Sequence, residues 1–367
     1  MKVCFIIWAL TAAGAERVLS ILANEWAQKG WDDVILTTDS DQAIPFYPLV
    51  DSIELIQLNL LKDSHSFRSA ISNNIRRLAT LRRVIKEKSP DVLISFIDTT
   101  NSLTIMATRG LGIPVIISER TDPSRRSLGR FWGAIRDFTY PLADLIVFQS
   151  CGVRDWFPPR VRARGVVIPN PVPRPPAVSL VLPKKSPALR IVSMGRLSPV
   201  KGFDVLIQAF ALASARTPHW HLDIWGQGPE RPSLEELAGN LGMGEQIKFP
   251  GVTERPFDIL RDADLFILSS HAEGFPNALA EAMACGLPVI STRFGGAADD
   301  MITDGLDGIL VPPGNPEALA EAMVQLMTDP GKRARLGAQA SRVVERFSME
   351  RVFGMWEEAV HRVTEGS

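Results

Sequence analysis

Residues 270–290 read SHAEGFPNALAEAMACGLPVI, and this stretch decides the fold. An apolar run ends just before it, a Gly-Phe-Pro turn follows, and Pro276 is well placed in the first turn of a helix predicted over 276–284. A second apolar run, 288–292, comes directly after this helix. A strand, a helix and another strand in close succession predict two parallel strands connected by a helix that covers them.

The same alternation extends through the rest of the chain. Helical patterns such as 16–29, 204–215 and 316–327 lie between short apolar runs. This alternation predicts an α/β fold, with parallel sheets covered by helices on both faces. The predicted strands are 3–8, 34–37, 92–96, 115–118 and 145–149, followed by 190–194, 221–225, 247–249, 265–269, 288–292 and 308–311.

Composition excludes several classes of protein. The chain has 367 residues, of which 46% are hydrophobic and 22% charged, so it is a folded protein with room for two domains. The net charge of −1 argues against a general nucleic-acid binder. The three cysteines are far apart, which predicts neither a disulfide framework nor a metal cluster. No apolar run has the roughly 18–20 residues that span a bilayer.

The charge divides the chain into two halves. Up to Arg174 there are 22 basic and 17 acidic residues, whereas the remainder has 18 basic and 24 acidic residues. The change coincides with six prolines between 171 and 187, which is the composition of a linker. We therefore predict a domain over 1–172, a linker over 173–189 and a second domain over 190–349. The C-terminal helix, about 350–367, is expected to pack back on the first domain.

The N-terminus has two interpretations. Met1–Ala15 is uncharged after Lys2 and ends in small residues, which resembles a cleavable signal peptide. The alternative is a first strand, a turn of small residues and a helix over 16–29, with Gly30 just past its end. We favour the second interpretation because the helical pattern continues through the supposed cleavage point.

Two cations follow the first strand of the second half. Residues 194–203 read MGRLSPVKGF, so Arg196 and Lys201 lie five positions apart on one loop. Ligands of parallel sheets bind beyond the carboxyl ends of the strands, where such loops lie. A guanidinium and an ammonium together make a good receptor for a diphosphate. The alternative is that both are ordinary solvated surface charges.

Two glutamates frame the helix within the deciding stretch. Glu273 precedes this helix and Glu281 lies about one turn inside it. The main-chain amides near Asn277 present the positive end of the helix dipole. An unpaired carboxylate among apolar strands is costly, so a functional role for the two glutamates is favoured over plain surface charge.

Two further loops are rich in small residues. Residues 11–17 read TAAGAER and residues 294–300 read FGGAADD, each after a predicted strand. Small residues let main-chain amides approach an anion at a helix N-terminus, here near Gly14 and Ala15. A tight turn without a ligand explains the first loop equally well.

These motifs resemble the donor site of retaining GT-B glycosyltransferases of family 4. The matching segments are GRLSPVKGFD at 195–204, the Glu-x7-Glu element at 273–281, ACGLPVI at 284–290 and, more loosely, GAERV at 14–18. Asp299 departs from the pattern, because glutamate is usual there. The resemblance covers nearly the whole chain and implies two Rossmann-like domains whose sheets face each other across a cleft.

The resemblance also implies roles for the donor-site residues and a UDP-linked sugar as donor. It implies retention of anomeric configuration, without a metal or a resident cofactor. Lys201 and Arg196 would hold the diphosphate, assisted by amides near Gly14, Ala15 and Asn277. Glu281 would bind the ribose, Glu273 with the main chain of Phe275 and Pro276 would orient the sugar, and the base would lie near Val252.

The first half resembles a narrower group that builds lipid-linked oligosaccharides and exopolysaccharides at the bacterial inner membrane, including N-acetylgalactosaminyltransferases of protein glycosylation. The matching residues are Ser95-Phe96, Asn101, SERTDP at 118–123 and IPNP at 168–171. The resemblance implies transfer of a hexose or N-acetylhexosamine to a lipid-linked pyrophosphate glycan. Glu119 stands where many relatives have histidine, and is a candidate for orienting the acceptor or handling its proton.

A basic helix indicates a membrane partner. Between Lys62 and Lys88 eight basic residues stand against two acidic ones, and a second set of arginines lies between Glu119 and Arg136 beside Phe131 and Trp132. Basic amphipathic helices bind anionic membrane surfaces, although a solvated helix face is the plain alternative. We therefore expect a cytoplasmic protein peripherally bound to the inner membrane. The helix carries Arg76, Arg77, Arg82, Arg83 and Lys86.

Some signals are set aside, and two rival functions stay open. Asp262-Ala263-Asp264 precedes a strand, which is the wrong end for a ligand, and His271 has no partner at metal-ligand spacing. Cys285 is expected to be a small core residue. The rivals are a non-hydrolysing sugar-nucleotide epimerase of the same architecture and a secreted two-lobed binding protein. Neither explains the paired cations and the paired glutamates together.

Overall fold

The computed structural model describes residues 1–11, 14–40, 43–60, 67–121, 123, 128–176 and 188–366. The chain divides into two compact units. The N-terminal unit comprises Met1–Asn170 and Val352–Ser367, and the C-terminal unit comprises Pro171–Arg351. Most of the predicted linker, 177–187, lies outside the described residues, as do Ala12 and Ala13 of the first small-residue loop.

The N-terminal unit is built on one parallel sheet of seven strands. The strand order is β3-β2-β1-β4-β5-β6-β7, so consecutive strands are joined by crossovers. β1 is central and pairs with both β2 and β4, which agrees with the strand interpretation of the N-terminus. The strands are β1 (Lys2–Ile7), β2 (Asp32–Thr37), β3 (Glu54–Gln57), β4 (Val92–Phe96), β5 (Val115–Glu119), β6 (Leu145–Phe148) and β7 (Gly165–Val167).

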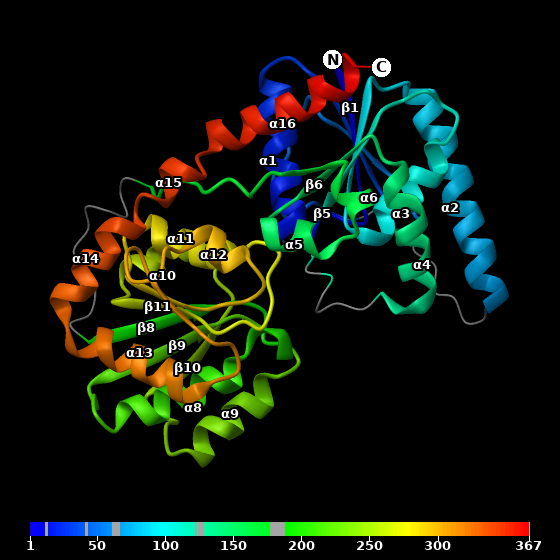
Figure 1. Cartoon of the computed structure of the whole chain (residues 1–367). Coiled ribbons are helices and arrows are strands. Elements are labelled where there is room, and N and C mark those ends of the chain that lie inside the picture. The colour runs from blue at the N-terminus through cyan, green and yellow to red at the C-terminus, as the bar shows by residue number, and fades with distance from the viewer. Residues whose placement is uncertain are drawn as a thin grey trace. The chain divides into compact units, whose positions relative to one another are not determined.

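Helices cover both faces of this sheet (Figure 1). On one face Cys4 and Ile6 of β1 pack in a core shared with α2 and α3. On the other face Phe5 stacks on Trp26 of α1, because successive side chains of a strand point to opposite faces. The helices are α1 (Gly14–Gln28), α2 (Phe67–Lys88), α3 (Asp98–Thr108), α4 (Gly129–Thr139), α5 (Cys151–Trp156), α6 (Pro159–Arg162) and α16 (Met349–Thr364), with a 3-10 turn η1 (Tyr140–Leu142).

The last helix, α16, belongs for most of its length to the N-terminal unit. Its Trp356 is fully buried and stacks on Phe96 at a ring distance of 6.1 Å. Lys29, just after α1, forms an ion pair of 2.6 Å with Glu357. The aromatic stacking is the stronger anchor, because exposed ion pairs contribute little.

The C-terminal unit repeats the architecture with six parallel strands in the order β10-β9-β8-β11-β12-β13. Its strands are β8 (Leu189–Met194), β9 (Trp220–Trp225), β10 (Ile247–Gly251), β11 (Leu265–Leu268), β12 (Val289–Thr292) and β13 (Ile309–Val311). Its helices are α8 (Phe203–Ser214), α9 (Arg231–Asn240), α10 (Pro256–Arg261), α11 (Asn277–Ala284), α12 (Ala297–Met301), α13 (Pro316–Thr328), α14 (Pro330–Ala340) and α15 (Val343–Arg346), with a 3-10 turn η2 (Pro199–Lys201).

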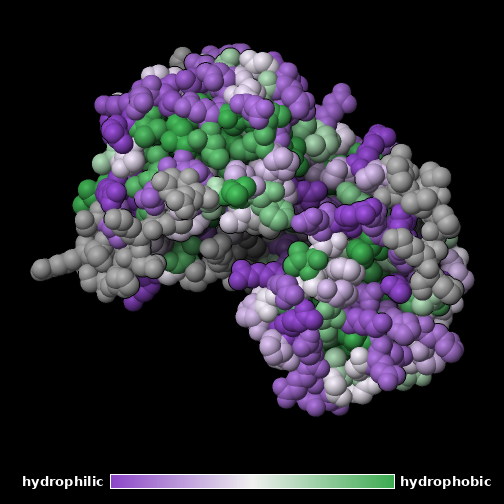
Figure 2. All heavy atoms as spheres, turned by 180° about the vertical axis from the view of Figure 1, so that it is seen from behind, coloured by the Kyte–Doolittle hydropathy of each residue, from purple (hydrophilic) through white to green (hydrophobic). Residues whose placement is uncertain are grey.

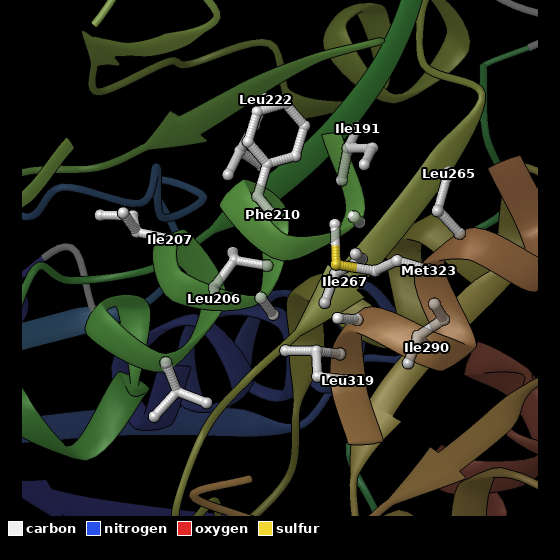
Figure 3. Packing of buried hydrophobic residues seen from close by; sticks show 14 of the residues in the cluster. Ile191, Leu206, Ile207, Phe210, Leu222, Leu265, Ile267, Ile290, Leu319 and Met323 are labelled. Carbon is white, nitrogen blue, oxygen red and sulfur yellow. The ribbon is translucent and has the colours of Figure 1, made fainter. Parts of the chain in front are cut away.

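One face of this second sheet packs against α8 and α13. Figure 3 shows Phe210 and Leu206 of α8 lying among strand side chains such as Leu222 and Ile267, with Met323 of α13 close by. These side chains are fully buried. The apolar spacing that predicted α8 therefore corresponds to its core-facing side.

Most of the surface seen in Figure 2 is hydrophilic, with hydrophobic side chains gathered in limited areas. Among the helices that the structure describes, none has the length and apolar character needed to cross a bilayer.

A substitution of Phe210 tests the packing of this core. Replacing it with alanine leaves a cavity between α8 and the sheet, so Phe210→Ala should lower the free energy of unfolding by about 3–5 kcal/mol. Leu212→Ala on the same helix is the matched control, because Leu212 is half exposed, and it should change stability by about 0.5 kcal/mol or less. Urea unfolding followed by circular dichroism measures both. Equal losses in the two variants would contradict this packing.

Candidate functional site

The loops after β8 and β9 are held together main chain to main chain. The Gly195 amide donates to the Trp225 carbonyl at 2.9 Å, and the Leu197 amide donates to the Gln227 carbonyl at 2.9 Å. A Cβ atom on Gly226 would lie 1.9 Å from the Gly195 oxygen, and one on Gly228 would lie 2.1 Å from the Leu197 oxygen. Only glycine fits at either position. The loop after β9 therefore holds the loop that carries Arg196 in place. The sequence analysis did not single out this second loop.

Lys201 and Glu273, predicted from separate motifs, form an ion pair. Lys201 Nζ lies 2.5 Å from Glu273 Oε1, and the Ser270 hydroxyl donates to the same oxygen at 2.7 Å. Both charged side chains are largely shielded from solvent, which strengthens their attraction. The pair joins the loop after β8 to the loop after β11.

Main-chain bonds support this pair. The His271 amide donates to the Val200 carbonyl at 2.7 Å, and the Ser269 hydroxyl donates to the Lys201 carbonyl at 2.9 Å. Gly202 adopts the left-handed conformation with φ 59°, and a Cβ atom there would lie 2.4 Å from the Ser269 oxygen. The residue after Lys201 must therefore be glycine for the two loops to meet.

Glu281 lies on the buried side of α11. It is almost fully buried, as are the flanking Ala280 and Ala282, which pack in a hydrophobic cluster. Before α11, the Phe275 ring meets Phe347 edge-on at 5.8 Å, and Pro276 is buried. These contacts hold the turn between Glu273 and α11 in place. The Asn277 amide donates to the Phe275 carbonyl at 3.0 Å.

Arg196 and Val252 are exposed after the carboxyl ends of β8 and β10, the two strands that flank β9. Val252 follows β10 with 70% of its surface exposed, and the preceding Gly251 has φ 99°. Within the described residues Arg196 has no ion-pair partner. Because β10, β9, β8 and β11 are adjacent in the sheet, the predicted residues of this unit gather at one edge.

The loop after β12 joins the same edge. Gly295 and Gly296 both have positive φ angles. Asp299, where the family pattern has glutamate, forms an ion pair with Arg293, and Arg293 also lies 3.7 Å from Asp304. These side chains are about half exposed, so the ion pairs hold the loop only weakly.

The residues that the sequence analysis excluded from the site lie in structural roles. They are Asp264, Cys285 and His271. Asp264 accepts a hydrogen bond of 2.8 Å from the Arg190 amide, at the amino end of β11 and β8 and thus at the opposite edge. The Cys285 thiol has its pKa raised to about 12 by burial, so it is unreactive. The His271 ring lies against Gly202 and Gly314.

At the start of α1, Gly14 and Ala15 form the first helical residues, two positions earlier than predicted. The next residue, Glu16, is buried and accepts a hydrogen bond of 3.2 Å from the Thr11 hydroxyl. Burial raises the pKa of Glu16. Its second oxygen has no partner within the described residues.

Glu119 ends β5 and is completely buried. Its Oε1 accepts from the amides of Arg120 and Thr121 at 3.0 and 3.1 Å and from the Thr121 hydroxyl at 2.7 Å. Its Oε2 accepts from the Tyr140 hydroxyl at 2.7 Å, and Asn101 contacts the same hydroxyl at 3.3 Å. With both oxygens engaged, this geometry favours a positioning role for Glu119.

The Glu119 carboxyl group titrates in an unusual environment. Burial, and then the nearby Asp98, raise its pKa, while the hydrogen bonds from Thr121 and Tyr140 act against this rise. Burial also raises the pKa of Tyr140 well above its usual value, so Tyr140 remains a donor to Glu119.

The main chain is strained directly after β4, the strand that pairs with β5. Ile97, directly after β4, has φ 74°, which is costly for a β-branched residue. Its amide donates to the Ser118 carbonyl at 3.2 Å, and its carbonyl accepts from the Asn101 amide at 2.8 Å. Such conformations persist where surrounding bonds enforce them, commonly at functional sites.

Arg120 is a buried cation that the sequence analysis did not select. Its guanidinium lies over the rings of Phe96 at 4.9 Å and Trp356 at 5.7 Å, and its Nη1 donates to Asn170 at 2.6 Å. Burial lowers its pKa to about 9. Two quoted motifs, SERTDP and IPNP, contain Arg120 and Asn170, but nothing in their spacing shows that they meet.

Fewer of the predicted cations of helix α2 are exposed to solvent than the sequence suggested. Arg77 donates to the Leu60 carbonyl at 3.2 Å and lies over Trp8, and burial lowers its pKa. Arg82 donates to the carbonyls of Ala107 and Arg109 at 2.7 and 2.8 Å. These two arginines therefore stabilise the fold. Among the α2 side chains that the structure describes, the exposed cations are Arg76, Arg83 and Lys86.

Two cavities among the described residues have linings that include none of the predicted site residues. A cavity of about 320 Å³ in the N-terminal unit is lined by residues including Ile105, Arg109 and Val115, at the amino end of β5. Glu119 lies at the other end of that strand. This cavity and Glu119 therefore lie at opposite edges of the sheet.

Comparison with known proteins gives a consistent assignment for both units. Residues 12–174 match the family described as Glycosyltransferase Family 4, and residues 180–343 match Glycosyl transferases group 1. A relative from Campylobacter jejuni is 27% identical over 99% of both chains. It is named GalNAc-alpha-(1->4)-GalNAc-alpha-(1->3)-diNAcBac-PP-undecaprenol alpha-1,4-N-acetyl-D-galactosaminyltransferase.

Solved structures show the same fold. Sucrose-phosphate synthase from Thermosynechococcus elongatus superposes with a TM-score of 0.84 at 19% identity and full coverage of both chains. HepE from Anabaena, solved in complex with UDP, gives a TM-score of 0.78 at 19% identity, covering 99% of this chain and 100% of that one. The predicted α/β architecture of two Rossmann-like units is confirmed.

The buried Glu119 generates a pH prediction. Because its pKa is raised on folding, the folded protein holds this proton to higher pH than the unfolded chain. Its contribution to stability is therefore greatest at low pH and is lost as the pH rises from about 4.5 through the folded pKa. Glu119→Gln removes the titration, so wild-type stability minus variant stability should fall with rising pH.

Urea unfolding at a series of pH values measures this difference. Glu358→Gln, an exposed glutamate on α16 of the same unit, is the control and should give a nearly constant difference. A difference for Glu119→Gln that stays constant or rises with pH would contradict the buried geometry.

Proposed function

We propose that this chain moves a hexose or N-acetylhexosamine from a UDP-sugar to a lipid-linked glycan. The chain belongs to the group 1 glycosyl transferases and carries a family 4 N-terminal unit. The observation that carries the proposal is the Lys201–Glu273 pair beside Arg196, at the carboxyl ends of β8 and β11. The relative from Campylobacter jejuni, whose name gives a PP-undecaprenol glycan, supports the acceptor class.

The cations would serve the diphosphate of the donor. Lys201 is held in place by Glu273, and Arg196 lies exposed on the same rigid loop. As the glycosidic bond to the nucleotide breaks, negative charge grows on the leaving diphosphate. A fixed ammonium and guanidinium stabilise that charge without having to reorganise, so they lower the barrier rather than only tighten binding.

The carboxylates would orient the sugar and the ribose. Glu273 is restrained by Lys201 and by the Ser270 hydroxyl, so its position is defined before a ligand arrives. A restrained acceptor of hydrogen bonds can select sugar hydroxyls by geometry. Glu281, buried along α11, would accept from the ribose hydroxyls. These two roles come from the family resemblance.

The base would be read mainly by the main chain. Gly251 is the last residue of β10 and the exposed Val252 follows it. The Gly226 amide donates to the Gly251 carbonyl at 2.8 Å. Main-chain readout leaves little trace in side chains, so the choice of uracil rests on the relatives. Anabaena HepE, which has the same fold, was solved with UDP.

We further propose retention of anomeric configuration, without a metal or a resident cofactor. The Campylobacter jejuni relative is named as an alpha-transferase, and an alpha product from an alpha-linked nucleotide sugar retains configuration. Lys201 and Arg196 would supply the positive charge that a metal supplies elsewhere.

The N-terminal unit would receive the acceptor at the carboxyl ends of its strands. Glu119 and Tyr140 would hold the loop after β5 rigid, and Gly14 and Ala15 would offer main-chain amides. The exposed cations of α2, namely Arg76, Arg83 and Lys86, would bind the anionic surface of the inner membrane on its cytoplasmic face. The pyrophosphate of a lipid-linked acceptor would lie at this same membrane surface.

Binding of UDP in the absence of metal tests the donor site. At about 100 times its dissociation constant UDP should stabilise the protein by roughly 2.7 kcal/mol, seen as a rise in melting temperature. Lys201→Ala and Glu281→Ala should abolish the rise. Arg216→Ala is the matched control, because Arg216 forms an exposed ion pair with Glu321 on the other side of the unit's core, and it should keep the full response.

The outcomes separate the parts of the proposal. A response to GDP alone would contradict the UDP assignment and keep the enzyme class. No response to either nucleotide would remove the support for a donor site on these loops. The melting temperature of each ligand-free variant is measured first, so that loss of folding is not read as loss of binding.

Flotation with liposomes tests the basic face of α2. The triple variant Arg76→Gln, Arg83→Gln, Lys86→Gln should bind anionic liposomes more weakly at low salt, because each basic residue near such a surface contributes about 1 kcal/mol. The control replaces three exposed arginines of the C-terminal unit, namely Arg216, Arg335 and Arg342, and should bind like wild type. Equal binding by the triple variant and wild type would contradict this face as the membrane contact.

A further inference from the structure

Helix α4 leaves large aromatic side chains in solvent. Phe131 is 58% exposed and Phe138 is 73% exposed, and they lie seven residues apart, which is two turns along one side of the helix. The opposite side, with Arg136 and Thr139, is buried against the rest of the unit. The exposed side is therefore apolar without being part of the core.

A third exposed aromatic residue lies beside α4. Trp156, at the end of α5, is 43% exposed, and the Arg136 guanidinium lies over its ring at 4.8 Å. Arg160 of α6 donates to the Asp137 carbonyl at 3.2 Å, so α5 and α6 adjoin the C-terminal half of α4. We name Phe131 and Phe138 the α4 aromatic surface.

The surroundings of the α4 aromatic surface are basic. Residues 128–164 contain six arginines and three aspartates. Arg130, Arg160 and Arg162 are exposed, whereas Asp155 is paired with Arg154 at 2.9 Å. Aromatic side chains beside exposed arginines match the headgroup region of an anionic bilayer, where rings enter the apolar boundary and guanidinium groups meet phosphates.

The α4 aromatic surface lies in the same layer of helices as the basic helix α2. α2 and α4 both pack against α3, and all three lie along the same side of the N-terminal sheet (Figure 1). α2 contributes the exposed Arg76 and Arg83 and also Ile75, which is largely exposed. One layer of helices thus carries both exposed cations and exposed apolar side chains.

We propose that the α4 aromatic surface inserts into the headgroup region of an anionic lipid bilayer, and that it anchors the protein beyond what charge alone provides. The inference deepens the proposed function, because it rests on an acceptor held in a membrane. A second copy of the chain fits the surface less well. A two-fold pairing would bring this basic surface, with Arg130, Arg160 and Arg162, against the same surface of the second copy, and like charges repel.

The main test is the double variant Phe131→Ser, Phe138→Ser in co-sedimentation with liposomes of phosphatidylglycerol and phosphatidylcholine. Its partition coefficient should be about tenfold lower or more, and its remaining binding should be released by salt. Wild type should keep a fraction of its binding at high salt. Leu212→Ser, Leu306→Ser is the control, because both leucines are about half exposed in the C-terminal unit, and it should bind like wild type.

Depth of insertion gives a second measurement. Phe138→Trp places a fluorophore on the surface, and lipids brominated along their acyl chains should quench the added emission. Leu212→Trp should show no added quenching. Absence of quenching for Phe138→Trp together with unchanged partition of the double serine variant overturns the inference, as does a change of oligomeric state without a change in liposome binding.

Failure of this inference is distinguishable from failure of the proposed function. The double serine variant should keep the full rise in melting temperature with UDP, because neither phenylalanine belongs to the donor unit. Unchanged membrane partition with an intact UDP response overturns the anchor alone. Loss of the UDP response in wild type overturns the donor assignment and leaves the partition measurement valid.

Discussion

The ion pair between Lys201 and Glu273 connects the features on which the candidate donor site depends. It joins the loop after β8 to the loop after β11, and Gly202 has a conformation and a close contact that no other residue allows. The neighbouring loop after β9 fixes the first loop through main-chain bonds. Ligand-binding charges gain most when they are held in place beforehand, and here the pairing itself supplies the restraint.

The N-terminal unit achieves similar rigidity by burying its polar groups. Glu119 accepts four hydrogen bonds out of contact with solvent, and the adjacent strand end includes the strained Ile97. Because both oxygens of Glu119 are bonded out of contact with solvent, these hydrogen bonds specify one loop conformation. The two units therefore use different means, an ion pair in one and a buried carboxylate in the other, to fix the loops at their strand ends.

The alternation of strands and helices was predictable from sequence, because buried parallel strands are nearly continuous apolar runs. The edge strands β3 and β7 were missed, since both are short and only partly buried. The donor motifs could be located in the sequence, but the contact of Lys201 with Glu273 could not, because 72 residues separate them. Arg77 and Arg82 show the same limit, since a helical pattern does not reveal which cations bind carbonyls of other segments.

The position of α16 has a consequence for the order of synthesis. The N-terminal unit leaves the ribosome first, but its last helix is made only after the C-terminal unit. Until then Phe96 and the buried Arg120 lack the indole of Trp356 that packs against them. This half of the protein thus remains incomplete while the other half is being made. A nascent chain must keep an uncovered aromatic face from aggregating until α16 has been made.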